Sequence, residues 1–170
     1  MAPVTGARGL VAFRAPTPQD TLPAWRLARK APRSGSPSRY SCARWFRDFA
    51  DTSLVAVAGR DVIGFLIGYR RPDVPDTYCV LRTEVGPHPG TPALGAQLLR
   101  AAAEREIARG ARFVEGAVPP GDAAGVEAYA QLARWYGAPA HKEALFPSSS
   151  SPGSDHDEIL HRIGPLYGTS

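Results

Sequence analysis

Residues 77–99 have an order of elements that can form an anion site. An aliphatic strand, TYCVLRTEV, is followed by a Gly/Pro-rich loop, GPHPGTPALGAQ, and by a helix that continues as LLRAAAERE. Unpaired N–H groups at the start of such a helix point outward and carry a partial positive charge. We therefore expect a diphosphate as the ligand, although Pro92 has no N–H to donate.

A second candidate for chemistry is Glu115, which lies in the apolar strand RFVEGAV. Burying a carboxylate is costly unless it is hydrogen-bonded. An acidic side chain in an apolar strand is therefore a candidate for a functional role. A carboxylate on a strand can act as a general base through a water molecule. The alternative is a residue at the strand end that faces solvent or pairs with Arg112.

The composition is that of a soluble globular protein, with 44% hydrophobic and 21% charged residues. We expect one domain over residues 1–170, with a Ser-rich connector at 148–155 inside it. No apolar run is long enough for a membrane span and the N-terminus does not resemble a signal peptide, which favours the cytoplasm. Cys42 and Cys79 are the only cysteines, and we expect neither a disulfide nor a metal site.

The net charge of +4 is concentrated near the N-terminus, where the first 50 residues hold nine basic and two acidic side chains. Such a segment can attract nucleic acid, an anionic cofactor or an acidic substrate. No basic strand interleaved with aromatic residues and no recognition-helix pattern accompanies it. We therefore expect no nucleic-acid partner and interpret the arginines as surface residues of helices.

Apolar periodicity and turn residues predict seven strands and four helices. The strands are expected over Gly9–Ala15, Ser53–Ala58, Val62–Tyr69, Thr77–Val85, Arg112–Val118, His141–Phe146 and Glu158–Ile163. The helices are expected over 17–30, Arg39–Ala50, Pro92–Arg109 and Asp122–Tyr136. Adjacent strands early in the chain and helical crossovers later predict an α/β fold, with a central mixed sheet flanked by helices on both faces.

This order of elements resembles the GCN5-related N-acetyltransferase fold. Within that superfamily, the segments SRYSCARWFRDFADTSLVAV, VIGFLIGYRRPDVPDTY, FVEGAVPPGDAA and HDEILHRIGPL are similar to the L-2,4-diaminobutyric acid acetyltransferases of ectoine biosynthesis. The resemblance covers most of residues 11–167. It implies transfer of an acetyl group from acetyl-CoA to the 4-amino group of L-2,4-diaminobutyrate or a related small amine, with a homodimer as one expected assembly.

The resemblance also implies roles for individual residues. Glu115 falls on the position of the catalytic-site glutamate, and Tyr129 matches the superfamily tyrosine that protonates the departing thiolate, with core packing as its alternative. Acetyl-CoA is expected to bind along the first strand, the loop and the helix start, at Val85, Thr91, Ala93, Leu94 and Gly95. The amine is expected to contact Tyr40, Leu81, Thr83, His156 and Glu158.

Several positions depart from the family pattern. The phosphate loop lacks an arginine and two glycines, with Gly90 and Pro92 among the residues in their place, and a tryptophan of the pocket wall is Leu81. An aspartate before Tyr40 is Gly35, and the neighbouring Arg82 is expected to favour an anion if it faces the pocket. Two alternatives therefore remain: other acid/base chemistry in the same cleft without acetyl-CoA, or a non-catalytic binding module.

Overall fold

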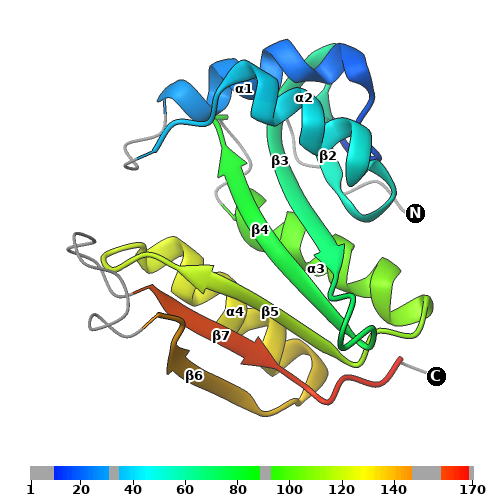
Figure 1. The fold of residues 1–170 in the computed structure, drawn as a ribbon, viewed down its shortest axis with the longest axis vertical. Helices are drawn as coiled ribbons and strands as arrows, with labels where there is room; N and C mark the ends of the chain where they lie inside the picture. Colours follow the sequence, from blue (N-terminus) through cyan, green and yellow to red (C-terminus); the bar gives the residue numbers. More distant parts are fainter. Residues whose placement is uncertain (1–9, 31–34, 89–92, 147–157, 169–170) are drawn as a thin grey trace.

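The structure, a computed structural model, describes residues 10–30, 35–88, 93–146 and 158–168. Its seven strands form one sheet in the order β1-β2-β3-β4-β5-β7-β6 (Figure 1). The strands are β1 Val11–Arg14, β2 Leu54–Ala58, β3 Asp61–Arg70, β4 Thr77–Val85, β5 Phe113–Val118, β6 Ala140–Ala144 and β7 Ile159–Ile163. The helices are α1 Thr21–Lys30, α2 Arg39–Asp48, α3 Leu94–Ala108 and α4 Ala123–Tyr136, with short 3-10 turns at Pro18–Asp20 (η1) and Ala50–Thr52 (η2).

The predicted fold class is confirmed, including the mixed sheet. The only parallel pair among the described strands is β4 with β5, and the other neighbours are antiparallel. Polar caps set two of the helix starts: Ser38 Oγ accepts a hydrogen bond from the Ser41 N–H, and Asp122 accepts one from the Gly125 N–H. Among the described residues, no helix is both long and apolar enough to cross a membrane.

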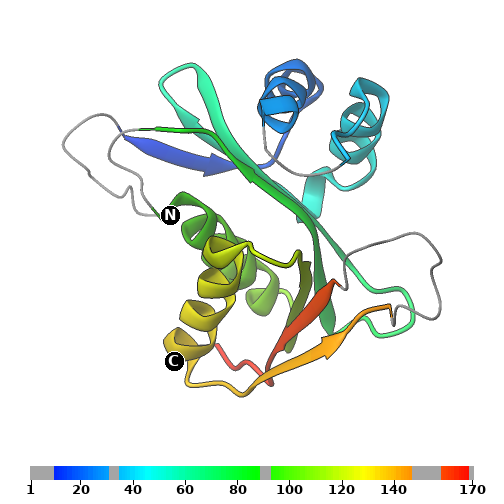
Figure 2. The ribbon, with the colours of Figure 1, turned by 90° about the vertical axis from the view of Figure 1, so that its left-hand side faces the viewer.

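Helices cover both faces of the sheet, as expected (Figure 2). On one face α1 and α2 bury a small core that includes Ala24, Phe46 and Phe65. On the other face α3 and α4 bury a larger core that includes Leu98 and Val114. The alternation of side chains along each strand therefore decides which of two separate environments a residue enters.

Strands β4 and β5 pair only at their beginnings and then diverge (Figure 1). Their register runs from Thr77 opposite Phe113 to Val80 opposite Gly116. On the other side of β4, the pairing with β3 shifts at Leu81, because Val80 and Arg82 have partners on β3 and the residue between them has none. This β-bulge bends the strand where the divergence starts.

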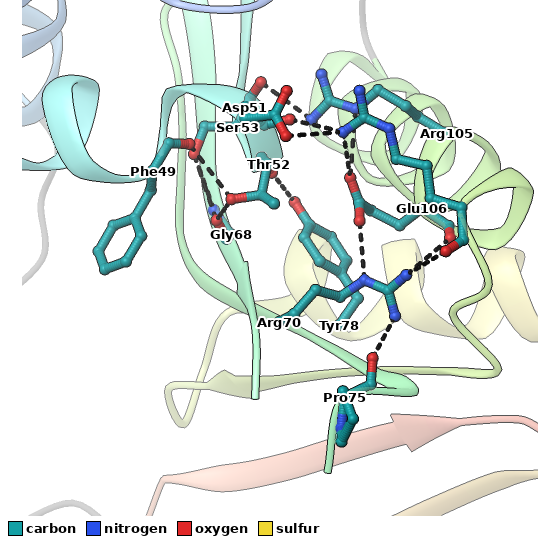
Figure 3. A network of polar contacts seen from close by, with 11 residues as sticks. Phe49, Asp51, Thr52, Ser53, Gly68, Arg70, Pro75, Tyr78, Arg105 and Glu106 are labelled. Carbon is teal, nitrogen blue, oxygen red and sulfur yellow. Dashed lines mark hydrogen bonds and ion pairs between the residues drawn. The ribbon is translucent and has the colours of Figure 1, made fainter. Parts of the chain in front are cut away.

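A buried polar network holds the C-terminal half of α3 against the sheet (Figure 3). Glu106 is 1% exposed, and its carboxylate lies 2.9 Å from Nε of Arg70 on β3 and 3.4 Å from Nη1 of Arg109. Tyr78 on β4 donates its hydroxyl to the carbonyl of Thr52 in the same region. The network fixes α3 relative to β3 and β4, and so fixes the position of the helix start.

Candidate active site

The divergence of β4 and β5 opens a cavity of about 260 Å³, with α3 and α4 forming its other walls. Six of the residues predicted for the site line this cavity: Leu81, Thr83, Val85, Ala93, Gly95 and Tyr129. They come from β4, the start of α3 and the middle of α4. The structure therefore brings the predicted strand, loop end and helix together around one space, as a strand–loop–helix anion site requires.

Tyr129 reaches the point where the two strands separate. A Cβ atom at Gly116 would lie 1.9 Å from the Tyr129 hydroxyl, so only glycine leaves room for this side chain. The phenol ring stacks on His161 of β7, with 5.3 Å between ring centroids. Within the described residues the hydroxyl has no hydrogen-bond partner. Burial, with smaller effects of Cys79 and Glu115, raises the pKa of Tyr129, so the phenol keeps its proton at neutral pH.

Glu115 lies on the opposite face of β5 from Tyr129. Its neighbour Val114 belongs to the core under α3 and α4, so strand alternation turns Glu115 toward the face that carries α1 and α2. The carboxylate is 5% exposed and accepts a 2.7 Å hydrogen bond from Nη1 of Arg162 on β7. Nη1 of Arg71 lies 3.4 Å away and the Cys79 thiol 3.2 Å away.

The alternative interpretation of Glu115 expected a carboxylate that faces solvent or pairs with Arg112. The structure shows neither, because the carboxylate is buried and is bound by Arg162. Arg112 instead donates to the Tyr167 hydroxyl at 3.1 Å. Burial, followed by the hydrogen bond to Glu115, raises the pKa of the Cys79 thiol to about 12, so the thiol stays protonated and donates. Glu115 does not line the cavity, and it lies on the other face of β5 in the last but one residue pair before the strands diverge.

The remaining predicted residues are distributed less compactly. The side chain of Leu94 does not line the cavity: it is 2% exposed and packs in the core beside Gly64, because the helical period turns this position toward β3. Tyr40 is 69% exposed in the first turn of α2, where its hydroxyl accepts a hydrogen bond from Arg44. Glu158 is exposed just before β7. Thr91 and His156 lie outside the described residues.

Arg82 is among the residues that line the cavity, but its guanidinium already has an acidic partner. Nε and Nη2 of Arg82 lie 2.8 and 2.7 Å from one carboxylate oxygen of Glu84, which is 5% exposed. Nη1 of the same guanidinium donates to the carbonyl of Gly35 at 3.2 Å. The positive charge is therefore balanced within β4, and the side chain ties the loop before α2 to the strand.

Sequence reasoning missed the groups that surround Glu115. Arg162 is adjacent to Glu115 because β7 inserts between β5 and β6, with these two residues directly opposite each other. No local pattern gives that strand order. The bulge at Leu81 was also missed, since no glycine or proline marks it in the sequence.

The arrangement places an acid and a carboxylate on opposite sides of one opening. Tyr129 and the cavity lie on the α3/α4 face, and Glu115 with its arginines lies on the α1/α2 face. Beyond Val80 and Gly116, β4 and β5 are no longer paired with each other, which leaves a gap in the sheet at the cavity. Such a geometry suits group transfer between two substrates that enter from different sides.

The comparisons with known proteins agree with this geometry. No family model matches the chain. L-2,4-diaminobutyric acid acetyltransferase of Streptomyces coelicolor is 36% identical over 167 residues, covering 96% of this chain and 98% of that protein. The enzyme of the same name from Nocardia farcinica is 32% identical over 158 residues, covering 93% and 82%.

Solved structures with the same fold include the diaminobutyrate acetyltransferase EctA from Paenibacillus lautus, in complex with L-2,4-diaminobutyric acid and coenzyme A. It superposes with a TM-score of 0.84 over 95% of this chain and 99% of that one, at 24% identity. The acetyltransferase yncA from Salmonella typhimurium, solved with acetyl-CoA, has a TM-score of 0.70 over 94% and 96% at 12% identity. By fold and by sequence, the chain belongs to the L-2,4-diaminobutyric acid acetyltransferase family.

Proposed function

We propose that the protein transfers the acetyl group of acetyl-CoA to the 4-amino group of L-2,4-diaminobutyrate. Family membership supports the reaction, and one observation carries it: β4 and β5 pair over four residues and then separate around an open cavity. The cavity holds the thioester arm, and the amine enters from the α1/α2 face. A cytoplasmic location and a homodimer remain predictions beside this proposal.

The bulge in β4 supplies the group that activates the thioester. Leu81 has no register partner on β3, and its N–H is the group proposed to bind a ligand at the start of the divergence. An N–H aimed at the thioester oxygen stabilises the negative charge that develops there during attack, an effect often worth about 2.7–4 kcal/mol. The half-exposed side chain of Leu81 lines the cavity at the same point.

Proton transfer is divided between the two faces. An alkyl ammonium has a pKa of about 10 and must lose a proton before it attacks. Glu115 takes this proton through a water molecule, while Arg162 and Arg71 hold the carboxylate in place. When the carbon–sulfur bond breaks, Tyr129 gives its phenolic proton to the departing CoA thiolate, and the second proton that the acetylated nitrogen loses restores the phenol. Tyr40, His156 and Glu158 are proposed to bind the acceptor, with Glu158 opposite its α-ammonium.

The test is an assay of thiol release from acetyl-CoA with L-2,4-diaminobutyrate and a panel of small diamines. We expect turnover that falls about 100-fold or more in Glu115→Gln and in Tyr129→Phe. Glu143→Gln, which changes an exposed carboxylate on β6, is the matched control and should retain activity. Absence of turnover on every amine, together with no CoA binding by calorimetry, would reject the proposed reaction. Full activity in Glu115→Gln would reject the role of this residue alone.

A further inference from the structure

Four side chains form a polar row across neighbouring strands on the face that carries Glu115. The register places Tyr69 of β3 opposite Cys79 of β4, and Cys79 opposite Glu115 of β5. Glu115 is in turn opposite Arg162 of β7. Adjacent strands are about 4.8 Å apart, so side chains paired in this way on one face are neighbours. The carboxylate of Glu115 is therefore held between a residue of β4 and a residue of β7.

The two oxygens of this carboxylate have different partners. Oε2 lies on the β7 side and accepts a 2.7 Å hydrogen bond from Arg162. Oε1 lies on the β4 side, where Sγ of Cys79 is 3.2 Å away and Nη1 of Arg71 is 3.4 Å away. The gap in the sheet opens between β4 and β5, so Oε1 is the oxygen on the side of the gap. The short charge-assisted bond to Arg162 also leaves Oε2 less available for a proton.

The hydrogen bond from Cys79 differs from those of the two arginines because the donor carries no charge. Burial raises the pKa of the thiol, which therefore stays protonated and can donate to Oε1. Arg71, the charged group near the same oxygen, is also bound by Asp73, with 2.8 Å between Nη2 and Oδ2. A neutral donor orients Oε1 without placing a positive charge where a substrate ammonium has to approach.

We propose that Cys79 is a positioning residue for Glu115: its thiol orients Oε1, and Oε1 receives the proton of the substrate ammonium. The inference rests on the proposed function, because it assumes that Glu115 is the base. One N–H bond of the ammonium breaks and its electron pair stays on nitrogen. The bridging water passes a proton on as an O–H bond forms at Oε1, and the thiol keeps its own proton. The carboxyl group gives up this proton to solvent before the next turnover.

Infrared spectroscopy tests the hydrogen bond without requiring turnover. The chain has two thiols, and each S–H stretching band is assigned by its loss in Cys79→Ala or Cys42→Ala. Within the described residues, Cys79 donates to a carboxylate and Cys42 has no hydrogen-bond partner, so the Cys79 band should lie at lower frequency. Glu115→Gln should move the Cys79 band to higher frequency and leave the Cys42 band in place. Equal frequencies, or no response to Glu115→Gln, would overturn the inference.

Kinetics tests the positioning role on the same proteins. Cys79→Ala should lower kcat about fivefold, the effect of one neutral hydrogen bond, and leave CoA binding unchanged. It should also move the acidic limb of the pH profile of kcat to higher pH, because the charged carboxylate loses a donor. Cys79→Ser can still donate and should recover most of the rate. Cys42→Ala removes the other buried thiol and is the matched control, which should change neither quantity.

The remaining groups around Glu115 do not titrate on the acidic side. Arg162 and Arg71 stay charged, and burial raises the pKa values of Tyr69 on β3 and Tyr129 on α4, so both phenols stay neutral. The inference is overturned if Cys79→Ala leaves kcat and the acidic limb unchanged, or if Cys42→Ala changes them equally. A loss of rate that Cys79→Ser does not recover, with the limb in place, would also overturn it. Absence of turnover by the unaltered chain on every amine is a different result, which would reject the proposed function while the infrared bands still report the hydrogen bond.

Discussion

Replacing Gly116 by alanine tests whether the Tyr129 hydroxyl lies at the strand divergence. The added Cβ would be 1.9 Å from the hydroxyl oxygen and 3.1 Å from the carbonyl oxygen of Val80. Real Cβ atoms essentially never approach other atoms within 3.0 Å. The hydroxyl must therefore retreat by at least about 1 Å in the variant, and overpacking of this kind costs about 1–3 kcal/mol of unfolding free energy.

A double-mutant cycle separates this contact from a general effect of the alanine. Tyr129→Phe removes the clashing oxygen and should cost less than about 1 kcal/mol by itself, because no described hydrogen bond is lost. In the double variant, Tyr129→Phe should restore about 1 kcal/mol or more of the unfolding free energy that Gly116→Ala removes. The reason is that the nearest remaining atom, Cζ of the ring, lies 3.0 Å from the new Cβ. Urea unfolding of the four proteins measures the coupling.

Activity provides an independent measurement on the same four proteins. Gly116→Ala displaces the hydroxyl that is proposed to protonate the thiolate, so turnover should fall about 100-fold, as in Tyr129→Phe. The double variant should be no slower than either single one, because the same proton donor is lost. Additive unfolding energies, with coupling below about 0.5 kcal/mol, would refute the reasoning. Normal turnover in Gly116→Ala would refute the role of the hydroxyl position.

Two further predictions concern the buried titratable side chains Glu106 and His161. Glu106→Gln should lower the unfolding free energy by about 3–5 kcal/mol, because it leaves the buried guanidinium of Arg70 without its carboxylate. Glu104 is half-exposed, so the control Glu104→Gln should cost under about 1 kcal/mol. Urea titration measures both values. Burial and, to a smaller degree, Lys142 lower the pKa of His161 below its usual 6.5. Near this pH the unfolded chain therefore binds more protons than the folded one. The free energy of unfolding should fall as the pH drops below about 6.5. His161→Phe keeps the stack on Tyr129 and should flatten this part of the pH dependence of unfolding; an unchanged slope would contradict the assignment.

The fold could be predicted because each element carries its own local signal. The strand expected over Thr77–Val85 has the observed bounds, and the helix expected from Asp122 to Tyr136 begins after its Asp122 cap and ends at Gly137. Periodicity, caps and turn glycines depend on neighbouring residues alone, so they can be recognised without tertiary structure.

The contacts of Glu115 could not be predicted, because they depend on strand order. The residues Glu115 and Arg162 are 47 positions apart and meet only after β7 inserts beside β5. Arg71 comes from the segment that follows β3, on the other side of β4. An apolar strand with one acidic residue indicates that the carboxylate has a partner. The pattern does not identify the basic side chain that pairs with it.

A group of residues beside α2 is linked through Arg82. Cys42 on α2, the Arg82–Glu84 pair on β4 and the carbonyl of Gly35 are connected: Arg82 reaches both Glu84 and Gly35, and the electrostatic environment of the Cys42 thiol is set by Arg82 and Glu84 after burial. They belong to α2, to the segment before it and to β4.

We therefore expect transfer chemistry and acceptor choice to depend on different residues. The proposed transfer groups are Glu115, Tyr129 and the bulge at Leu81, whose positions are set by β-sheet pairing and by the space above Gly116. The wall under α2 carries the internally balanced ion pair of Arg82 and Glu84, to which the carbonyl of Gly35 is tied. Because that pair carries no net charge, it adds neither attraction nor repulsion for an ammonium at long range. Variation in this wall is thus expected to change the shape of the accepted amine, and the KM for it, before it changes the rate of acetyl transfer.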